Sequence, residues 1–382
     1  MPNIKRIINL PERLRSKSAF LLGPRQTGKT SVIRDQLADF KNINLLLNDT
    51  FLAFTQNKRE LRERVSKSDK IVIIDEIQRI PELLNEVQYL IEELGIIFLL
   101  TGSSARKLRR QGVNLLGGRA RQYRMRPFCY AEIKNEFELD RALNRGLIPS
   151  IYFSDAPELD LASYVGLYLK EEIAAEALTR NIAAFSRFLQ TAALSNGQII
   201  NHTNIANDAQ VPRTTVIEYF SILNDTLFSD YLEPWRETKK RKPISTSKFY
   251  FFDIGIVSQL QQRGTIKPKS PLYGDALEAY IHHELRCRSD YVSYAPLNFW
   301  RSTTNFEVDF VYDNRIAIEV KAKDQLSKKD LTGIRALKEE KNLESYHVVY
   351  LGDVKKVLED GIESWPVREF LEALWNGTFD RA

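Results

Sequence analysis

The stretch Gly23-Pro24-Arg25-Gln26-Thr27-Gly28-Lys29-Thr30 decides the fold of the first part of this chain. It fits the pattern GxxxxGK[ST], and it lies between an apolar run at 18–22 and a helical pattern at 31–40. The two glycines let the loop wrap so that backbone N–H groups point at phosphate oxygens, and the N-terminus of the next helix adds its positive end. We therefore expect ATP to bind along this loop and Ser31, with Lys29 at the β- and γ-phosphates and Thr30 on Mg²⁺.

The surrounding sequence predicts a parallel β-sheet. Further short apolar runs stand at 43–47, 71–74 and 96–100, and helical patterns such as the one at 81–94 separate them. Buried strands that alternate with helices are typical of α/β domains, in which crossover helices cover a parallel sheet. Ligands bind at the carboxyl ends of such strands, so the polar residues that follow them are the candidates for chemistry.

Acidic and hydroxyl side chains follow two of these predicted strands. Asp75 and Glu76 come at the end of the second run, where Asp75 would hold Mg²⁺ through water and Glu76 would polarise the water that attacks ATP. The third run is followed by the candidates for sensing the γ-phosphate, which are Thr101, Ser103 and Ser104. Together these residues predict a site for ATP hydrolysis.

Arg119, in Leu116-Gly117-Gly118-Arg119, allows two interpretations. As an arginine finger, acting in cis or from a neighbouring subunit, it would stabilise the charge that develops during phosphoryl transfer. Alternatively, it is a structural residue held in an ion pair. The sequence leaves both open.

Composition narrows the class of protein. The chain has 382 residues, of which 43% are hydrophobic, and a formal net charge of +5. No run of 18 apolar residues occurs, so we expect no membrane span, and the N-terminus lacks the long apolar core of a secretory signal. The two cysteines, Cys129 and Cys287, have no metal-binding spacing and suit a reducing cytoplasm, where we expect the protein to be.

The middle of the chain predicts a helix-turn-helix with a basic hairpin. A short helix from Asn204, a turn at Val211-Pro212 and a second helix to Leu223 are followed by strands near 226–236 and 246–252. The loop between these strands contains Lys239-Lys240-Arg241-Lys242. A basic wing tip beside a recognition helix indicates DNA contact, although such winged helices also serve as packing or protein-contact modules.

The C-terminal third shows a second α/β pattern. We expect helices at 274–287 and 327–341 and strands near 291–295, 306–312, 316–321 and 346–351. In the hairpin formed by the second and third of these strands, a three-residue loop pairs apolar with apolar residues, for example Phe310 with Ile318. This register places Asp309 opposite Glu319 on the other face, with Lys321 close by.

Two carboxylates that face each other repel unless a cation lies between them, and oxygen ligands suit Mg²⁺ or Mn²⁺. Lys321 would activate water or offset phosphate charge, and Glu278 in the preceding helix would add a further carboxylate. Such a site suits metal-assisted phosphodiester hydrolysis. The alternative is a charged outer face of the hairpin with a cross-strand ion pair.

These motifs resemble those of bacterial and archaeal fusion ATPases, in which an AAA-type domain is joined to a C-terminal domain of unknown function. The resemblance covers nearly the whole chain, and includes Ile74-Asp75-Glu76-Ile77-Gln78, Leu100-Thr101-Gly102-Ser103-Ser104 and Ile318-Glu319-Val320-Lys321. The C-terminal domain of that family is similar to the PD-(D/E)xK nuclease fold, whose site positions fall on Glu278, Asp309, Glu319 and Lys321. One departure is Leu116-Gly117-Gly118, where relatives usually have an alanine.

The sequence thus predicts an α/β protein with an AAA-type core at 1–126, a helical lid at 127–195, a winged helix at 196–255 and a nuclease-like domain at 256–382. We expect ATP-controlled cleavage of DNA by a metal-dependent site. The alternative is a nucleotide-switched module that binds DNA or protein and has a non-catalytic nuclease-like domain. A homo-oligomer is compatible with either function, because AAA-type ATPases often form rings.

Overall fold

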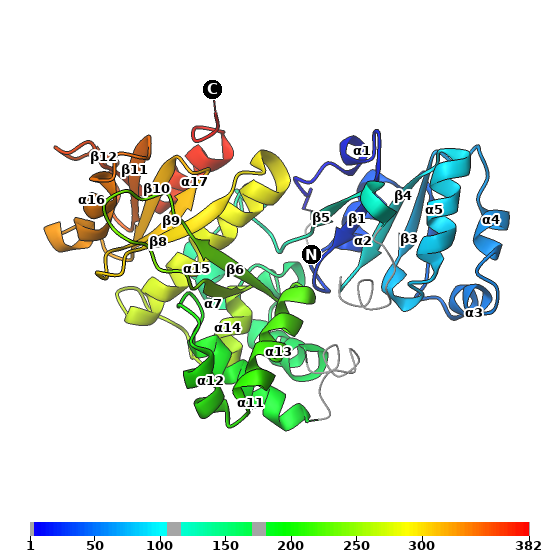
Figure 1. Ribbon diagram of the computed structural model, residues 1–382, viewed down its shortest axis with the longest axis horizontal. Coiled ribbons are helices and arrows are strands. Elements are labelled where there is room, and N and C mark those ends of the chain that lie inside the picture. Colours follow the sequence, from blue (N-terminus) through cyan, green and yellow to red (C-terminus); the bar gives the residue numbers. More distant parts are fainter. Residues whose placement is uncertain (1–3, 105–115, 170–180, 382) are drawn as a thin grey trace. The chain divides into compact units, whose positions relative to one another are not determined.

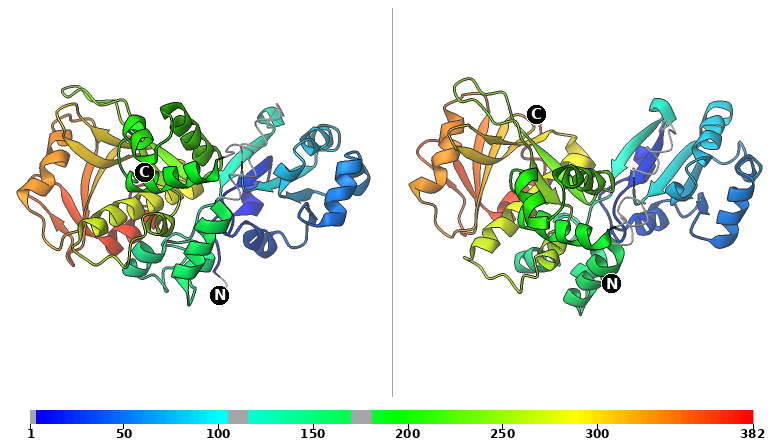
Figure 2. Two further views of the ribbon diagram at one scale, coloured as in Figure 1. Left: turned by 90° about the horizontal axis from the view of Figure 1, so that it is seen from below. Right: turned by 60° about the horizontal axis from the view of Figure 1, so that its bottom comes forward.

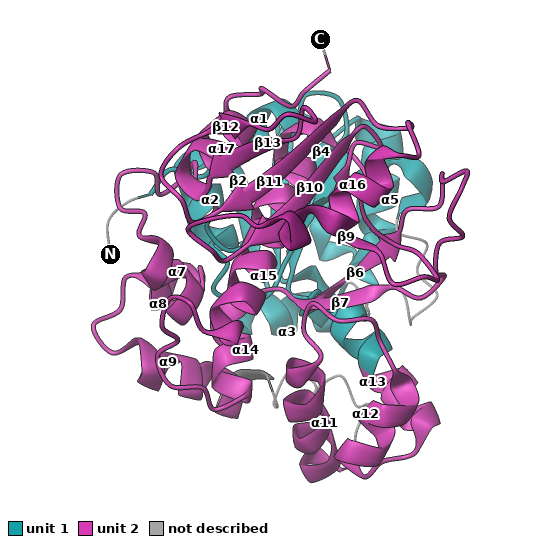
Figure 3. Cartoon of the chain, turned by 90° about the vertical axis from the view of Figure 1, so that its left-hand side faces the viewer, with its two compact units in different colours: residues 1–128, 220–228 teal, residues 129–219, 229–382 magenta. Residues whose placement is uncertain are grey.

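A computed structural model describes residues 4–104, 116–169 and 181–381. The chain forms two compact units: unit 1 contains residues 1–128 and 220–228, and unit 2 contains residues 129–219 and 229–382 (Figure 3). The domain boundaries expected at 126/127, 195/196 and 255/256 stay predictions, and part of the expected lid, residues 170–180, lies outside the described residues. None of the helices in the described part of the chain has the length and apolar character needed to cross a membrane.

Unit 1 is built on a five-stranded parallel sheet, as the sequence predicts (Figure 1). The strand order is β2-β3-β4-β1-β5, and every neighbouring pair is parallel. The strands are β1 (Ser18–Leu22), β2 (Lys41–Asn44), β3 (Ile71–Asp75), β4 (Ile97–Gly102) and β5 (Ala120–Arg124). The helices are α1 (Leu10–Arg13), α2 (Lys29–Gln36), α3 (Asn48–Gln56), α4 (Glu60–Arg64), η1 (Ile77–Arg79), α5 (Leu83–Leu94) and η2 (Leu116–Gly118).

The apolar runs of the sequence form the core of this unit. Every residue of β1 is buried, and β3 and β4 are buried except at their first residues. Residues such as Val72, Ile74, Phe98 and Leu100 pack in one cluster with the apolar face of α5. Burial on both faces explains why these strands read as continuous apolar runs rather than as alternating ones.

Unit 2 begins with a set of helices. These are α7 (Leu139–Arg145), α8 (Pro149–Tyr152), α9 (Pro157–Ser163), η3 (Tyr164–Leu169), α11 (Ile182–Leu194), α12 (His202–Ala209), α13 (Arg213–Asp225) and α14 (Ile254–Leu260). The side chain of Asn201 caps α12 by accepting hydrogen bonds from the N–H groups of Thr203 and Asn204. Helices α12 and α13 follow each other in the predicted helix-turn-helix order. The last turns of α13 are counted with unit 1.

An eight-stranded sheet forms the rest of unit 2, in the order β12-β13-β11-β10-β9-β8-β6-β7. Its strands are β6 (Ser229–Pro234), β7 (Lys248–Phe251), β8 (Leu297–Arg301), β9 (Glu307–Tyr312), β10 (Ile316–Lys321), β11 (Ser345–Tyr350), β12 (Lys356–Val357) and β13 (Glu363–Pro366). The helices are α15 (Pro271–Arg288), η4 (Ser289–Ser293), η5 (Lys328–Leu331), α16 (Thr332–Lys338) and α17 (Val367–Trp375). The long helix α15 lies against β9 and β10 (Figure 2).

The register predicted for the β9–β10 hairpin is confirmed. Tyr312 pairs with Ile316 and Phe310 with Ile318, across a three-residue loop. Both Asp313 and Asn314 have φ of 54° in this loop, a left-handed conformation that Asp and Asn tolerate better than most residues. Apolar pairing on one face therefore fixed the register, as argued from the sequence.

Two expectations differ from the structure. The strand expected near 291–295 is wrong, because α15 continues into the helical turn η4 and the strand β8 starts only at Leu297. The backbone bond from Tyr294 N–H to Ser289 C=O, 2.8 Å, closes the last turn of η4, so helical hydrogen bonding overrides the strand preference of these residues. In addition, the hairpin β6–β7 is not a separate wing: β6 pairs in parallel with β8 and joins the C-terminal sheet.

Candidate functional site

The loop of residues 23–30 lies at the carboxyl end of β1 and leads into α2. Gly28 has φ of 95°, and a Cβ atom at Gly23 would lie 2.3 Å from the carbonyl oxygen of Met125, so both positions require glycine. The ammonium group of Lys29 is buried and donates hydrogen bonds to the carbonyl oxygens of Gly23, 2.7 Å, and Pro24, 3.1 Å. The loop is therefore folded around its lysine, in the form that a phosphate site needs.

Four other residues predicted to bind nucleotide are at the surface. Arg25, Gln26, Thr30 and Ser31 are exposed, whereas Thr27 is buried and donates its hydroxyl hydrogen to the carbonyl of Pro24, 2.7 Å. The exposed hydroxyl of Thr30 at the start of α2 suits a magnesium ligand. A tightly held loop with an exposed rim fits a phosphate group and its Mg²⁺.

Arg6 is a part of this site that sequence reasoning missed. Its guanidinium group is buried and donates to the carbonyl of Thr27 in the loop and to the carbonyl of Arg126, 2.8 Å. It also lies over the ring of Phe128, 5.1 Å from the centroid. Arg6 thus links the phosphate loop to the segment after β5. These residues are far apart in the chain, so no motif in the sequence predicts the contact.

The ends of β3 and β4 bring the predicted catalytic residues together. The hydroxyl of Thr101 donates to Asp75 Oδ1 and accepts from the backbone N–H of Glu76, 3.2 Å. The amide Nε2 of Gln78 donates both to Glu76 Oε2 and to Ser103 Oγ, the latter at 3.1 Å. One amide group therefore links the predicted base to the predicted sensor hydroxyl.

Arg119 lies elsewhere on unit 1. Its guanidinium group forms an ion pair with Glu92 near the end of α5, 2.6 Å, and both side chains are about two-fifths exposed. This geometry matches the structural interpretation of Arg119. The arginine-finger interpretation stays a prediction.

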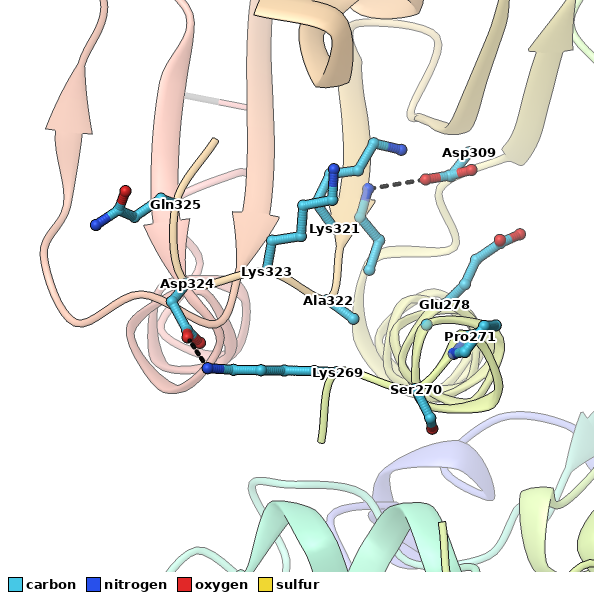
Figure 4. Close-up of a pocket in the computed structure, with 12 residues that line it drawn as sticks. Lys269, Ser270, Pro271, Glu278, Asp309, Lys321, Ala322, Lys323, Asp324 and Gln325 are labelled. Atoms are coloured by element: carbon cyan, nitrogen blue, oxygen red, sulfur yellow. Dashed lines mark hydrogen bonds and ion pairs between the residues drawn. The ribbon is translucent and has the colours of Figure 1, made fainter. Parts of the chain in front are cut away.

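A second cluster lies in unit 2, around a cavity of about 740 Å³ (Figure 4). Glu278 of α15, Asp309 of β9 and Lys321 of β10 line it, so the structure brings together three of the four residues predicted from the sequence. The fourth, Glu319, is buried next to them and accepts a hydrogen bond from Lys321 Nζ. The carboxylate of Asp309 also accepts the backbone N–H of Val320, 2.8 Å, which holds it between the two strands.

Strand β7 supplies two residues to this cluster that the sequence analysis missed. Lys248 is only 3% exposed, and its Nζ lies 3.0 Å from Glu278 Oε1, 2.7 Å from Glu307 Oε1 and 4.0 Å from Asp309 Oδ1. The hydroxyl of Tyr250 donates to the same Glu278 oxygen, 2.7 Å. The sequence contained one signal for this. In the strand Lys248-Phe249-Tyr250-Phe251, Lys248 and Tyr250 are two residues apart and therefore lie on the same face.

The pKa shifts reflect crowding of charge in a buried place. Burial raises the pKa of Asp309 well above its ordinary value, and the neighbouring carboxylates of Glu319 and Glu278 raise it further, against the lysines. Burial also raises the pKa of Glu319, against Lys321. Burial alone would lower the pKa of Lys248, but the surrounding acidic groups outweigh it and raise that pKa well above the usual range.

The fit of a divalent cation to this cluster can be judged from its oxygen atoms. Within the described ranges, no group of three or more His, Cys, Asp or Glu residues is arranged as a metal site. The ammonium groups of Lys248 and Lys321 lie among the carboxylates. Glu319 Oε2, however, is buried and has no hydrogen-bond partner among the described residues. An orphaned carboxylate oxygen, beside a second carboxylate on an open cavity, fits the oxygen ligands that Mg²⁺ and Mn²⁺ prefer.

The predicted basic wing tip is fixed to the C-terminal sheet region. The backbone N–H groups of Lys239, Lys240 and Arg241 donate to the buried carboxylate of Glu340, and the Arg241 side chain also pairs with Glu339. The positive charge of Arg241 is thus paired with an acidic side chain of the protein itself. The side chains of Lys239, Lys240 and Lys242 are exposed.

Three family models match parts of this chain. Residues 15–134 match the family described as AAA domain, and residues 136–267 and 273–370 match two domains of unknown function, DUF8612 and DUF4143. An uncharacterized protein of Mycobacterium tuberculosis is 24% identical over 312 residues, which are 77% of this chain and 67% of that protein. An uncharacterized protein of Haemophilus influenzae is 25% identical over 265 residues, 64% of each. The Walker-type ATPase of Pyrococcus abyssi has 18% identity and a TM-score of 0.46, covering 66% of this chain and 93% of that chain.

Proposed function

We propose that this chain, an AAA-type ATPase domain joined to two domains of unknown function, binds and hydrolyses ATP at the carboxyl ends of β1, β3 and β4. The observation that carries the proposal is the link from Glu76 through Gln78 to Ser103, beside the buried lysine of the phosphate loop. A base, a phosphate sensor and a phosphate-binding lysine at one sheet edge are the parts that ATP hydrolysis requires.

Each residue has a definite role in this proposal. Lys29 exchanges its bonds to the loop carbonyls for the β- and γ-phosphate oxygens, and Thr30 and Asp75 hold Mg²⁺, whose charge offsets that of the phosphates. Glu76 accepts a proton from the attacking water while the amide of Gln78 fixes its orientation. Thr101 keeps Asp75 in place by donating its hydroxyl hydrogen.

Nucleotide binding and turnover by two variants test this site. Lys29→Ala is expected to abolish ATP binding, and Glu76→Gln to retain binding but lose hydrolysis. Arg34→Ala, an exposed cation on the same helix α2, is the matched control and should behave as the wild type. Unchanged ATPase activity in Lys29→Ala would refute the assignment of the site.

A second activity is proposed for the cavity of unit 2: metal-dependent hydrolysis of DNA phosphodiester bonds, controlled by the nucleotide state of the ATPase site. Support comes from Glu278, Asp309 and Lys321, which line the cavity, and from the orphaned oxygen of Glu319. Asp309 and Glu319 would hold the cation, which lowers the pKa of its water and neutralises phosphate charge. Lys321 is placed to bind a phosphate oxygen.

DNA is the proposed substrate because unit 2 carries exposed cations on one loop and at the start of one helix. Lys239, Lys240 and Lys242 extend from a loop whose backbone is held by Glu340, and Arg213 is exposed at the start of α13. Cations fixed in position contact phosphates at a lower cost in conformational entropy than mobile ones. If the cavity is not catalytic, the same cations suit a nucleotide-switched DNA-binding module, which is the alternative function.

Cleavage of plasmid and single-stranded DNA with Mg²⁺ or Mn²⁺, with and without ATP, separates the two functions. A nuclease predicts cutting that both Asp309→Ala and Lys321→Ala abolish, and its dependence on ATP measures the control by the nucleotide. Absence of cutting with either metal, together with ATP-dependent DNA binding, would instead establish the switch.

A further inference from the structure

A further cavity of unit 2, of about 350 Å³, is lined by three arginines. Helices α7, α9 and α14 pack against one another around it (Figure 3). Arg141 and Arg145 lie one helical turn apart on α7, and Arg263 follows α14. All three residues are half-buried. A negatively charged ligand in this cavity would therefore meet three guanidinium groups.

Two of these arginines form no ion pair with a carboxylate in the described ranges. Arg145 Nη1 donates to the backbone carbonyl of Ser154, 3.3 Å, which is a neutral acceptor. Arg263 Nε is buried and has no hydrogen-bond partner in the part of the chain that the structure describes. Burial lowers the pKa of Arg263, against the attraction of Asp275. A buried charged donor without a partner costs free energy, and an anion bound between the two arginines would offset that cost.

The carboxylates that line the same cavity are paired, hydrogen-bonded or exposed. Glu138 pairs with Arg141, 2.7 Å, and Asp140 accepts the hydroxyl hydrogen of Tyr273, 2.6 Å. Glu158 is exposed on α9, where water screens its charge. These groups therefore oppose an anion less than the two unpaired guanidinium groups attract it.

The backbone around the two arginines is fixed. The N–H of Arg263 donates to the carbonyl of Ser258 in α14, 3.0 Å. Asn144, the neighbour of Arg145 on α7, accepts the N–H of Ile266 on its side-chain oxygen, 2.8 Å. The segment after α14 is thereby joined to α7, so the two guanidinium groups start from positions that the fold sets, which lowers the cost of ordering them on a ligand.

We propose that this cavity binds a phosphate group, free or as the monoester of a small molecule, through Arg145 and Arg263. The planar fork of an arginine donates two parallel hydrogen bonds to a phosphate, and two such forks suit its double negative charge. The hydroxyl groups of Ser258 and Thr265 line the same cavity and are further donors. A volume of about 350 Å³ is that of a small-ligand site. None of these residues takes part in the two activities proposed above.

Titration calorimetry of the full-length protein with two probes tests the proposal. The probes are inorganic phosphate and glycerol 3-phosphate. Tighter binding of glycerol 3-phosphate identifies a phosphomonoester as the ligand, and tighter binding of inorganic phosphate identifies the free ion. Both results support the site. Arg263→Gln and Arg145→Gln are each expected to weaken binding of the tighter probe by about 10-fold or more, because each removes charge-assisted hydrogen bonds.

Two controls separate this cavity from other anion sites of the protein. The loop of residues 23–30 in unit 1 is expected to bind phosphate as well, so each titration is repeated in Lys29→Ala, where the binding assigned to the cavity should persist. Arg236→Gln makes the same change of charge at an exposed arginine of unit 2 that does not line the cavity. It should leave the affinity for both probes unchanged.

Three results would overturn the proposal. They are no binding of either probe at millimolar concentration, wild-type affinity in Arg263→Gln, and an equal loss in Arg236→Gln, which would show unspecific attraction of anions. If Arg263→Gln does not fold, Arg263→Lys replaces it, because lysine keeps the charge but lacks the fork, and a loss of about 3-fold or more is expected. Unchanged affinity in Arg263→Lys would then overturn the proposal. All these results are independent of the ATPase and DNA-cleavage assays.

Discussion

Replacing Lys248 by methionine tests the electrostatics of the unit 2 site most directly. The substitution removes the ammonium group but keeps an unbranched chain that still packs in the interior. Lys248 is almost fully buried, and its charge is shared between Glu278, Glu307 and Asp309. Without it, these carboxylates lose their buried cation.

The loss of stability in Lys248→Met depends on which other partners each carboxylate retains. Removing one partner of a buried ion pair costs about 3–5 kcal/mol of unfolding free energy. Glu278 retains Tyr250, and Glu307 retains Arg301 at 3.3 Å, so part of the charge stays compensated. We therefore expect the lower end, about 3 kcal/mol, from the same range.

The pH dependence has a definite sign. The raised pKa of Lys248 means that its contribution is fully present below the unfolded lysine value of about 10.4 and is lost only as pH rises through the higher folded value. Asp309 also has a raised pKa, so its ionisation above the ordinary value of 3.8 destabilises the fold, and more so without Lys248. The cost of Lys248→Met should therefore be larger at pH 8 than at pH 4.

Urea unfolding followed by tryptophan fluorescence measures this cost. The chain has four tryptophans, Trp235, Trp300, Trp365 and Trp375, and all lie in unit 2, so the signal reports that unit alone. Lys323→Met is the control, since Lys323 is about half exposed and its ion pair with Asp330 is worth at most about 1 kcal/mol. A cost below about 1 kcal/mol, or one that does not change between pH 4 and pH 8, would refute the electrostatic role of Lys248.

Three further predictions concern unit 1. Thr101→Val leaves the buried carboxylate of Asp75 without its hydroxyl partner. ATP turnover should fall at least about 10-fold, as expected for a lost hydrogen bond of about 1–3 kcal/mol. ATP binding, measured by fluorescence, should change little. Arg6→Met removes the hydrogen bonds that link the phosphate loop to the segment after β5. A loss of about 1–3 kcal/mol should weaken ATP binding by about 10-fold or more in a nucleotide titration. Normal affinity would show that the loop keeps its conformation without Arg6. Arg119→Ala should leave kcat and ATP affinity unchanged if Arg119 only pairs with Glu92 on the surface, whereas a loss of kcat alone, by about 10³-fold or more, would identify an arginine finger.

The sequence by itself determined the features that depend on local patterns. The spacing of Gly23, Gly28 and Lys29 between an apolar run and a helical pattern predicts the strand, loop and helix that the structure contains. The register of the β9–β10 hairpin also followed from the sequence, because a slip by one residue would have exposed Phe310 and Ile318. In both cases the interacting residues are close along the chain, so their spacing carries the information.

Only the tertiary structure decided which distant residues complete the two sites. Nothing in the local pattern indicates that Arg6 contacts the phosphate loop, or that Lys248 and Tyr250 contact Glu278. The reason is that β6 pairs with β8, a strand far along the chain, and so brings β7 to the edge of the C-terminal sheet beside α15. An open strand edge has no preferred partner of its own, and the choice is made by the packing of the whole unit.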